Sequence, residues 1–385
     1  MAVRNMIGAY GPWAAGLAGR GPAALSFLQP RYRSLPAWRR QARARLRDLL
    51  AEPDRPQRPR ARVERRGRFG ELVFEELSWQ LPYGPRTRAV FLKPAGAAGR
   101  LPAILALHDH GGNKFFGADK IARLPGAQHP RMQTHQQHYY GGLAWANEIA
   151  RRGYAVLVPD AFSFASRRVR YADVPAHVGG DQAEPDPRSD EDIAAYNAWA
   201  AGHESIMAKS LFCAGTTWPG VFLHEDRCAL DYLCTRPDVD PARVGCGGLS
   251  GGGLRTVFLG GTDPRIRCAV CVGMMTTWRD YLLNKCHTHT WMIYVPGLPR
   301  DLDYPEILGL RAPRPTLVLN DIHDTLFTLP EMKRADRVLR AVYAKAGAPG
   351  RYRCSFYPGP HKFDRPMQAE AFDWFDRWLK DKDAP

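Results

Sequence analysis

Long apolar runs are missing from this sequence of 385 residues, and nowhere do about 18 apolar residues follow one another, as a membrane-spanning helix requires. A disulfide framework is missing too, because the eight cysteines stand at irregular spacings, several of them inside apolar, strand-like runs. The first residues lack the strong apolar segment of a secretory signal peptide. We therefore expect a cytoplasmic protein with free thiols and no membrane contact, although this pattern leaves secretion open.

Lysine is absent from the first 70 residues, which contain 16 Arg and 4 acidic residues and so carry most of the net charge of +15. The rest of the chain is nearly neutral, which argues against a body that binds nucleic acid. Leu35–Leu50 has a helical pattern in which Trp38, Leu46, Leu49 and Leu50 form an apolar stripe. We expect this helix to dock on the body with its arginines in solvent; contact of the arginines with an acidic polymer or surface is the alternative.

Repeats are also missing, and the composition of 45% hydrophobic and 24% charged residues is that of a globular protein. Residues 1–60 form an Arg/Pro-rich extension, in which Pro53–Pro59 suggests a linker. Residues 61–385 then predict one catalytic domain. Within it, residues 161–222 interrupt the alternating pattern and predict an inserted cap or lid.

Short apolar runs alternate with helical patterns from about residue 70 onward, which predicts an α/β fold with a mostly parallel sheet covered on both faces. The expected strands are Glu71–Trp79, Arg86–Lys93, Ala103–Leu107, Ala155–Val158, Arg243–Cys246, Cys268–Val272, Pro315–Leu319 and Tyr352–Phe356. The expected helices of the body are Gly142–Arg152, Glu191–His203, Leu223–Leu233, a helix after Ser250, Glu331–Ala346 and Met367–Leu379. In such sheets the chemistry lies beyond the carboxyl ends of the strands.

A glycine-rich turn with one serine follows the strand that ends near Cys246. Gly247-Gly248-Leu249-Ser250-Gly251-Gly252-Gly253 matches G-x-S-x-G, the nucleophile elbow between a strand and a helix. A strained serine at such a turn needs neighbours without side chains. A phosphate loop is the alternative, but the lysine of a P-loop is missing. We predict that Ser250 is a nucleophile and that the N–H of Gly251 is the first oxyanion donor.

A serine nucleophile needs a base and an acid, which in this arrangement follow it in the order Ser, Asp, His. His361 lies in a Pro/Gly loop after the last predicted strand and is the predicted base. Asp321 and Asp324 lie in one loop after the preceding strand. We favour Asp324, because the acid must lie far enough beyond the strand to reach the imidazole, whereas Asp321 would bond loop backbone.

The segment His108-Asp109-His110-Gly111-Gly112 follows the predicted strand Ala103–Leu107 and supplies the second oxyanion donor. We predict a backbone N–H of His110 or Gly111, with that of Gly112 as the remaining choice. The long segment before the acid is rich in aromatic and polar residues, and from it we select Trp278 and His287 as substrate-binding residues. The Cys268-x-x-Cys271 spacing lies within an apolar run, so we expect no metal, and no cofactor is implied.

These motifs together resemble the dienelactone hydrolase and acetyl xylan esterase branch of the α/β-hydrolases, over roughly residues 70–380. Asp324-Thr325-Leu326-Phe327 and Pro358-Gly359-Pro360-His361 complete the likeness, in the order of that branch. Dienelactone hydrolases use a cysteine nucleophile, so the serine at position 250 argues against a dienelactone substrate.

The resemblance implies a serine esterase that acts on a small-molecule or carbohydrate ester, such as an acetylated sugar or an aryl or alkyl ester. Two alternatives stay open. One is a peptidase or amidase with the same triad. The other is a non-catalytic protein that binds an acidic partner through its basic N-terminal arm. The oligomeric state is left open.

Overall fold

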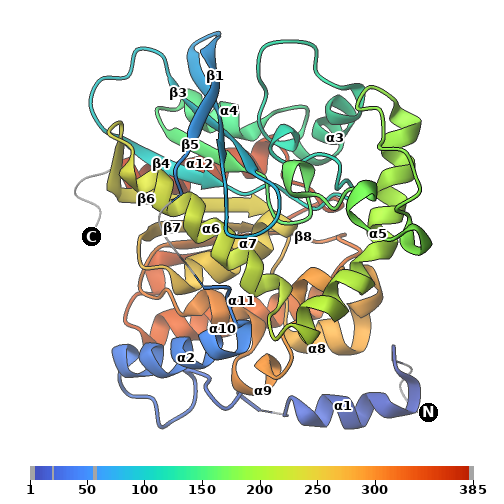
Figure 1. The fold of residues 1–385 in the computed structure, drawn as a ribbon. Helices are drawn as coiled ribbons and strands as arrows, with labels where there is room; N and C mark the ends of the chain where they lie inside the picture. Colours follow the sequence, from blue (N-terminus) through green and yellow to red (C-terminus); the bar gives the residue numbers. More distant parts are fainter. Residues whose placement is uncertain (1–4, 20, 55–58, 381–385) are drawn as a thin grey trace.

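A nine-stranded sheet forms the centre of the computed structural model, which describes residues 5–19, 21–54 and 59–380 (Figure 1). Six of its strands are parallel and carry the predicted apolar runs, and three antiparallel strands extend one side of them. The strands are β1 Arg62–Phe69, β2 Leu72–Trp79, β3 Thr87–Pro94, β4 Leu101–Ala106, β5 Ala155–Pro159, β6 Val239–Leu249, β7 Ile266–Val272, β8 Thr316–Asp321 and β9 Tyr352–Tyr357.

The strand order is β1-β2-β3-β5-β4-β6-β7-β8-β9. The pairs β1·β2, β2·β3 and β3·β5 are antiparallel, and every pair from β5·β4 to β8·β9 is parallel. The carboxyl ends of the parallel strands therefore meet along one edge of the sheet, where the loops after β4, β6, β7, β8 and β9 lie together. The predicted mostly parallel sheet is confirmed.

Helices cover both faces of the sheet, as the alternation of side chains in each strand requires. The helices are α1 Gly11–Leu17, α2 Leu35–Leu50, α3 Pro130–Tyr140, α4 Trp145–Arg151, α5 Asp190–Cys213, α6 Trp218–Thr235, α7 Gly251–Thr262, α8 Trp278–Asp280, α9 Leu298–Asp301, α10 Tyr304–Gly309, α11 Leu329–Lys345 and α12 Arg365–Phe375. Leu105 packs in the core with α2, α6, α7, α10 and α11, whereas its neighbour Ile104 faces α3, α4 and α12. No helix among the described residues combines the length and apolar character that a membrane crossing needs.

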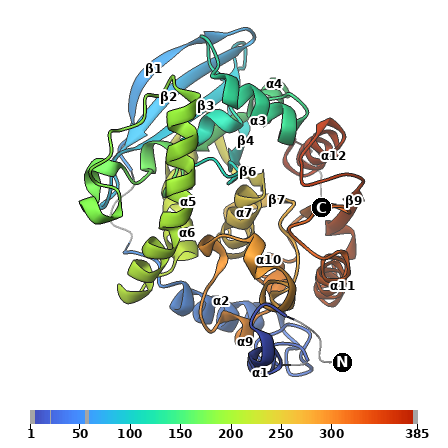
Figure 2. The ribbon, with the colours of Figure 1, turned by 90° about the vertical axis from the view of Figure 1, so that its right-hand side faces the viewer.

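The N-terminal segment is part of this core. Helix α2 has the predicted bounds, and Trp38, Ala42, Leu46 and Leu50 are buried against the body while Leu49 is partly buried. Both views show α1 and α2 beside α9 and α10 (Figures 1 and 2). Of the predicted linker, residues 55–58 lie outside the described part of the chain.

Arginines of α2 are divided between body and solvent. Arg43 donates from Nη2 to the carbonyl oxygens of Gly261 and Leu310, at 3.0 and 3.1 Å, and burial lowers its pKa to about 10. Arg40 and Arg47 are exposed. Part of the N-terminal charge therefore binds this segment to the body rather than remaining in solvent.

Residues 161–222 run from β5 to the first turn of α6 and contain the long helix α5, which lies at the right-hand side of Figure 1, away from the sheet. Asn197 of α5 accepts hydrogen bonds from the backbone N–H groups of Lys114 and Phe115, at 2.8 and 3.0 Å. The insertion is thus attached to the loop that follows β4, at the carboxyl edge of the sheet.

Candidate active site

Ser250 lies between the end of β6 and the start of α7, with φ 55° and ψ −116°. A side chain in this region of φ costs roughly 1–3 kcal/mol, which the surrounding fold must hold in place. Two hydrogen bonds do so: the N–H of Ser250 donates to Val272 O at 2.9 Å, and its carbonyl accepts from Leu254 N at 2.8 Å. Strain of this kind at a polar residue is typical of a functional site.

Glycines beside Ser250 let the turn approach β4 closely. A Cβ on Gly248 or on Gly252 would lie about 2 Å from the carbonyl oxygen of Leu107, at 2.1 and 2.0 Å respectively. No side chain fits at that distance, because the obstacle is backbone rather than a movable side chain. Close passage of the backbone is the predicted reason for the glycine run, and the neighbour that the turn passes is Leu107, in the loop after β4.

His361 and Asp324 are joined by a hydrogen bond of 2.6 Å between Nδ1 and Oδ2. The carboxylate is fully buried, and its other oxygen accepts from Leu326 N at 2.9 Å. Gly273, with φ 55°, makes room for the imidazole, since a Cβ there would lie 2.8 Å from His361 Cε1. With Nδ1–H directed to the carboxylate, Nε2 is the atom left to accept a proton.

Asp321 is the last residue of β8, directly before the loop that contains Asp324. Its Oδ2 accepts from Lys362 N at 3.1 Å, which is the role expected for the acid nearer the strand, and burial raises its pKa to about 7. Ligand-type atoms of Asp321, Asp324 and His361 lie within 4.8 Å of one another, a spacing that a metal ion could use. Within this group His361 and Asp324 bond each other, and Asp321 accepts from the backbone at Lys362.

Ser250 and His361 line one cavity of about 310 Å³. No hydrogen bond joins Ser250 Oγ to His361 Nε2 within the described residues, and Nε2 is buried without a partner there. Such contacts are often long before substrate binds. The apolar wall of the cavity consists of Leu254, Met274, Met292, Ile293 and Leu326, and its polar wall of His110, Gly111, Gly112, Tyr139, Thr288, His289 and Thr290.

The backbone of His110 approaches the turn at Ser250. A Cβ on Gly251 would lie 2.9 Å from His110 N, so the two predicted oxyanion donors are neighbours. Both residues line the Ser250 cavity, as does Gly111, which has φ 52°. The backbone of two segments, after β4 and after β6, therefore borders the same cavity.

Comparisons with known proteins match this architecture. The crystal structure of a "putative acetyl xylan esterase" from Bacteroides fragilis NCTC 9343 superposes with a TM-score of 0.68 at 17% identity, over 92% of this chain and 84% of that one. A glucuronoyl esterase from Solibacter usitatus superposes with a TM-score of 0.63 at 17% identity, over 93% of this chain and 97% of that one. The chain has the α/β-hydrolase fold.

A curated protein is similar in sequence. "Putative hydrolase YtaP" from Bacillus subtilis (strain 168) is 29% identical over 312 residues, which are 80% of this chain and 89% of that protein. No family model matches the sequence. The α/β-hydrolase fold that the motifs led us to expect is confirmed by these structural neighbours, one of which is a putative acetyl xylan esterase.

A side chain of α5, within residues 161–222, reaches the loop after β4. His110 Nε2 lies 3.0 Å from Glu204 Oε1 on α5, while His110 Nδ1 accepts from Gly112 N at 3.0 Å. Nε2 therefore carries the proton and donates it to the carboxylate. Burial lowers the pKa of His110, which keeps the ring neutral in this role.

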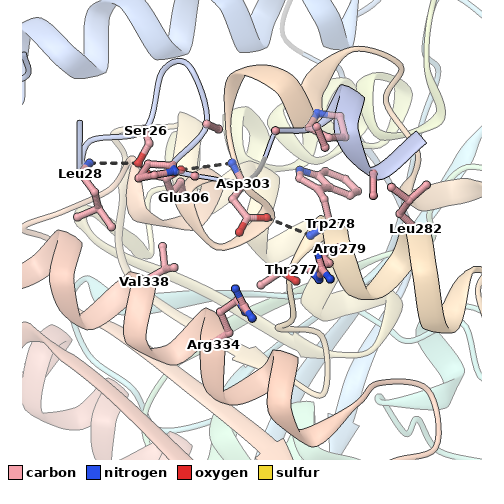
Figure 3. Close-up of a pocket in the computed structure, with 17 residues that line it drawn as sticks. Ser26, Leu28, Thr277, Trp278, Arg279, Leu282, Asp303, Glu306, Arg334 and Val338 are labelled. Atoms are coloured by element: carbon pink, nitrogen blue, oxygen red, sulfur yellow. Dashed lines mark hydrogen bonds between the residues drawn. The ribbon is translucent and has the colours of Figure 1, made fainter. Parts of the chain in front are cut away.

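Neither predicted substrate-binding side chain lines the Ser250 cavity. Trp278 lines a second cavity of about 330 Å³, between the N-terminal segment and the body (Figure 3). Its backbone N–H donates to Asp303 Oδ1 at 3.0 Å, and its ring lies across the cavity from Ser26 and Leu28. His287 is exposed. The sequence cannot show which residue of a short turn faces inward, and here it is His289.

His289 lines the Ser250 cavity and lies 2.8 Å from Leu326 O through Nε2. Burial lowers its pKa to about 4, so the ring is neutral and donates from Nε2. It connects the wall at residues 288–293 to the loop that holds Asp324.

Cys268 and Cys271 cannot share an ion, because they lie on opposite faces of β7, in separate cores. Burial raises the pKa of both thiols above 9, so these side chains behave as packed apolar groups.

Proposed function

We propose that this protein hydrolyses carboxylic esters through an acyl-enzyme formed on Ser250. The observation that carries the proposal is the strained Ser250, in a cavity that it shares with a histidine bound to a buried aspartate. Esterases among its structural neighbours, such as the glucuronoyl esterase, and the curated hydrolase support the same class of reaction.

In this mechanism Ser250 Oγ attacks the carbonyl carbon and His361 Nε2 takes the hydroxyl proton. Asp324 holds Nδ1–H and stabilises the imidazolium. Backbone N–H groups of Gly251 and of the His110–Gly111 segment hydrogen-bond the oxyanion. His361 then gives the proton to the leaving alcohol, and a water molecule, activated by the same imidazole, releases the acid.

The Ser250 cavity and the cleft next to it suit an ester with an apolar acyl group and a polar alcohol. Its wall of leucine, isoleucine and methionine suits a small apolar group such as acetyl. Next to it, across Gly111, Gly112 and Tyr139, lies an open cleft of about 470 Å³ that includes Thr134 and His138. Hydroxyl, imidazole and amide groups there suit a hydroxylated alcohol, so acetylated carbohydrates join aryl and alkyl esters as candidate substrates.

The test is the Ser250→Ala variant. We expect its kcat for aryl acetates to fall by about 10⁴-fold or more, because the acyl-enzyme cannot form. A fluorophosphonate probe should label the parent and not the variant. Ser163→Ala is a matched control, since Ser163 is also a buried serine at positive φ, 64°, but lies outside the Ser250 cavity.

A Ser250→Ala protein as active as the parent would exclude the proposal. A panel of acetylated sugars, aryl esters, methyl esters and peptide amides identifies the leaving group. Faster turnover of the amides than of matched esters would indicate a peptidase instead.

A further inference from the structure

Lys120 is a fully buried lysine below the loop that follows β4, at the end of the short 3-10 helix η2 (Ala118–Lys120). Its Nζ donates to the carbonyl oxygens of Asp109 and His110, both at 2.8 Å. The Asp109 carboxylate lies 4.0 Å from Nζ, and the centroid of the Phe164 ring lies 4.6 Å away. Burial of such a charge is costly, and the ester hydrolysis described above does not itself require it.

The hydrogen bonds from Lys120 to the carbonyls of Asp109 and His110 orient the N–H groups of the next residues, His110 and Gly111. In a trans peptide the C=O and the next N–H point to opposite sides. Lys120 holds the carbonyls of Asp109 and His110, so the N–H groups of His110 and Gly111 point away from it. On that opposite side lies Gly251, whose Cβ position is 2.9 Å from His110 N. The Lys120 ammonium therefore contacts the carbonyl side of the Asp109–His110 and His110–Gly111 peptides, and the N–H side of these peptides faces the turn at Ser250.

The side-chain carboxylate of Asp109 also anchors the loop after β4. Asp109 Oδ1 accepts from Tyr140 OH and lies 3.2 Å from His135 Nε2. A Cβ on Gly111 would lie 2.4 Å from both Asp109 Oδ2 and His135 Cε1, so this packing leaves no space for another residue. These contacts anchor the Asp109 side chain. The carbonyl oxygens of Asp109 and His110 also accept from His108 Nδ1 and Asn113 N, at 2.9 and 3.1 Å, but among the described residues Lys120 is the one side chain that donates to both.

We propose that Lys120 is a positioning residue for the oxyanion hole: it holds two peptides with their N–H groups toward the substrate carbonyl, and its charge polarises them. This inference rests on the proposed ester hydrolysis at Ser250. Its charge acts through the peptides and does not touch the substrate. Preorganised donors of this kind stabilise the transition state more than the bound ester.

Lys120→Met tests the proposal, because methionine fills a similar volume without charge or donors. With an aryl acetate as substrate, we expect kcat to fall about 100-fold and KM to change less than about threefold. Arg311→Met is the matched control. Arg311 is also a fully buried cation that donates to backbone carbonyl oxygens, those of Gly260 and Ile266 at 3.2 and 3.1 Å, but it lies outside the Ser250 cavity.

A phenylboronic acid, which forms a tetrahedral adduct with a serine, gives a second readout. Its Ki should rise in Lys120→Met by nearly the factor lost in kcat, whereas a merely structural defect would alter KM and Ki together. If Lys120→Met does not fold, the same ratio is measured in Lys120→Arg, which retains charge and donors. We expect Lys120→Arg to raise Ki more than KM.

The proposal is overturned if the folded variant retains kcat and Ki within threefold of the parent. It is also overturned if Arg311→Met loses kcat as strongly as Lys120→Met. An inactive Ser250→Ala together with an active Lys120→Met would reject this inference alone, whereas an active Ser250→Ala would reject the proposed function.

Discussion

Asp321, at the end of β8, and Asp324, in the loop after it, differ in what they contact, and a pair of isosteric variants separates their roles. Asp324 contacts the imidazole of His361 at 2.6 Å, whereas Asp321 accepts from the backbone at Lys362. In Asp324→Asn the amide can donate to Nδ1, which then presents the wrong tautomer at Nε2. We expect kcat for an aryl acetate to fall by about 10⁴-fold near neutral pH.

Asp321→Asn is the control, because an amide oxygen can still accept from Lys362 N. We expect its kcat to stay within about tenfold of the parent. Equal losses in the two variants would contradict the assignment of Asp324 as the sole orienting acid.

The residues Ser250, Asp324 and His361 were predictable because each follows a predicted strand and their order in the chain is restrictive. Lys120 was not, since a lysine after Gly117-Ala118-Asp119 has no pattern that distinguishes it from a surface charge. Its role depends on two backbone carbonyls, and the sequence does not show where a carbonyl points. The same reason explains why His287 was selected and His289 lines the cavity.

Elements with strong apolar patterns were predictable, and those stabilised by polar contacts were not. The parallel strands read as apolar runs because both their faces are covered. Strand β1, mostly exposed, and helix α3, rich in Gln and His, have no such signal. Helix α3 contributes His135 and Tyr139 to the region around the site, so the polar cleft beside Ser250 was missed with it.

Burial of helix α2 makes the N-terminal segment part of the core, so we expect substitutions on its buried face to destabilise the whole protein. Trp38 is fully buried, stacks on Phe27 with centroids 4.7 Å apart and donates from Nε1 to Leu25 O at 2.6 Å. Trp38→Ala should lower the free energy of unfolding by about 3–5 kcal/mol, measured by urea denaturation. Arg40→Ala, on the exposed face, should change it by less than about 0.5 kcal/mol. A small effect of Trp38→Ala would mean that the segment is not cooperative with the body.

At the scale of the whole molecule, Glu306 links the N-terminal segment to α10. Its Oε1 accepts from Ser26 Oγ at 2.5 Å and from Phe27 N at 3.0 Å, and its Oε2 accepts from Asp303 N at 3.3 Å (Figure 3). Burial raises the pKa of Glu306 to about 7, although the bond from Ser26 opposes the shift. The folded protein therefore holds a proton near pH 6 that the unfolded chain has released.

Because the folded state binds more protons than the unfolded state between about pH 4.5 and 7, the free energy of unfolding decreases as the pH rises through that range and is level above it. This group contributes up to about 3 kcal/mol to that decrease, from 1.36 kcal/mol per pKa unit. Asp321, with its pKa raised to about 7 by burial, adds in the same direction. We therefore expect the protein to be more stable at pH 5 than at pH 8.

Glu306→Gln removes the titration and keeps an amide oxygen for the bonds from Ser26 and Phe27. The variant should unfold at a higher urea concentration than the parent at pH 8 and at a similar one at pH 5, so its pH dependence is smaller. A parallel shift at both pH values would mean that the substitution alters packing rather than the proton balance. In that case the pH dependence would have to come from Asp321, and Asp321→Asn would flatten it instead.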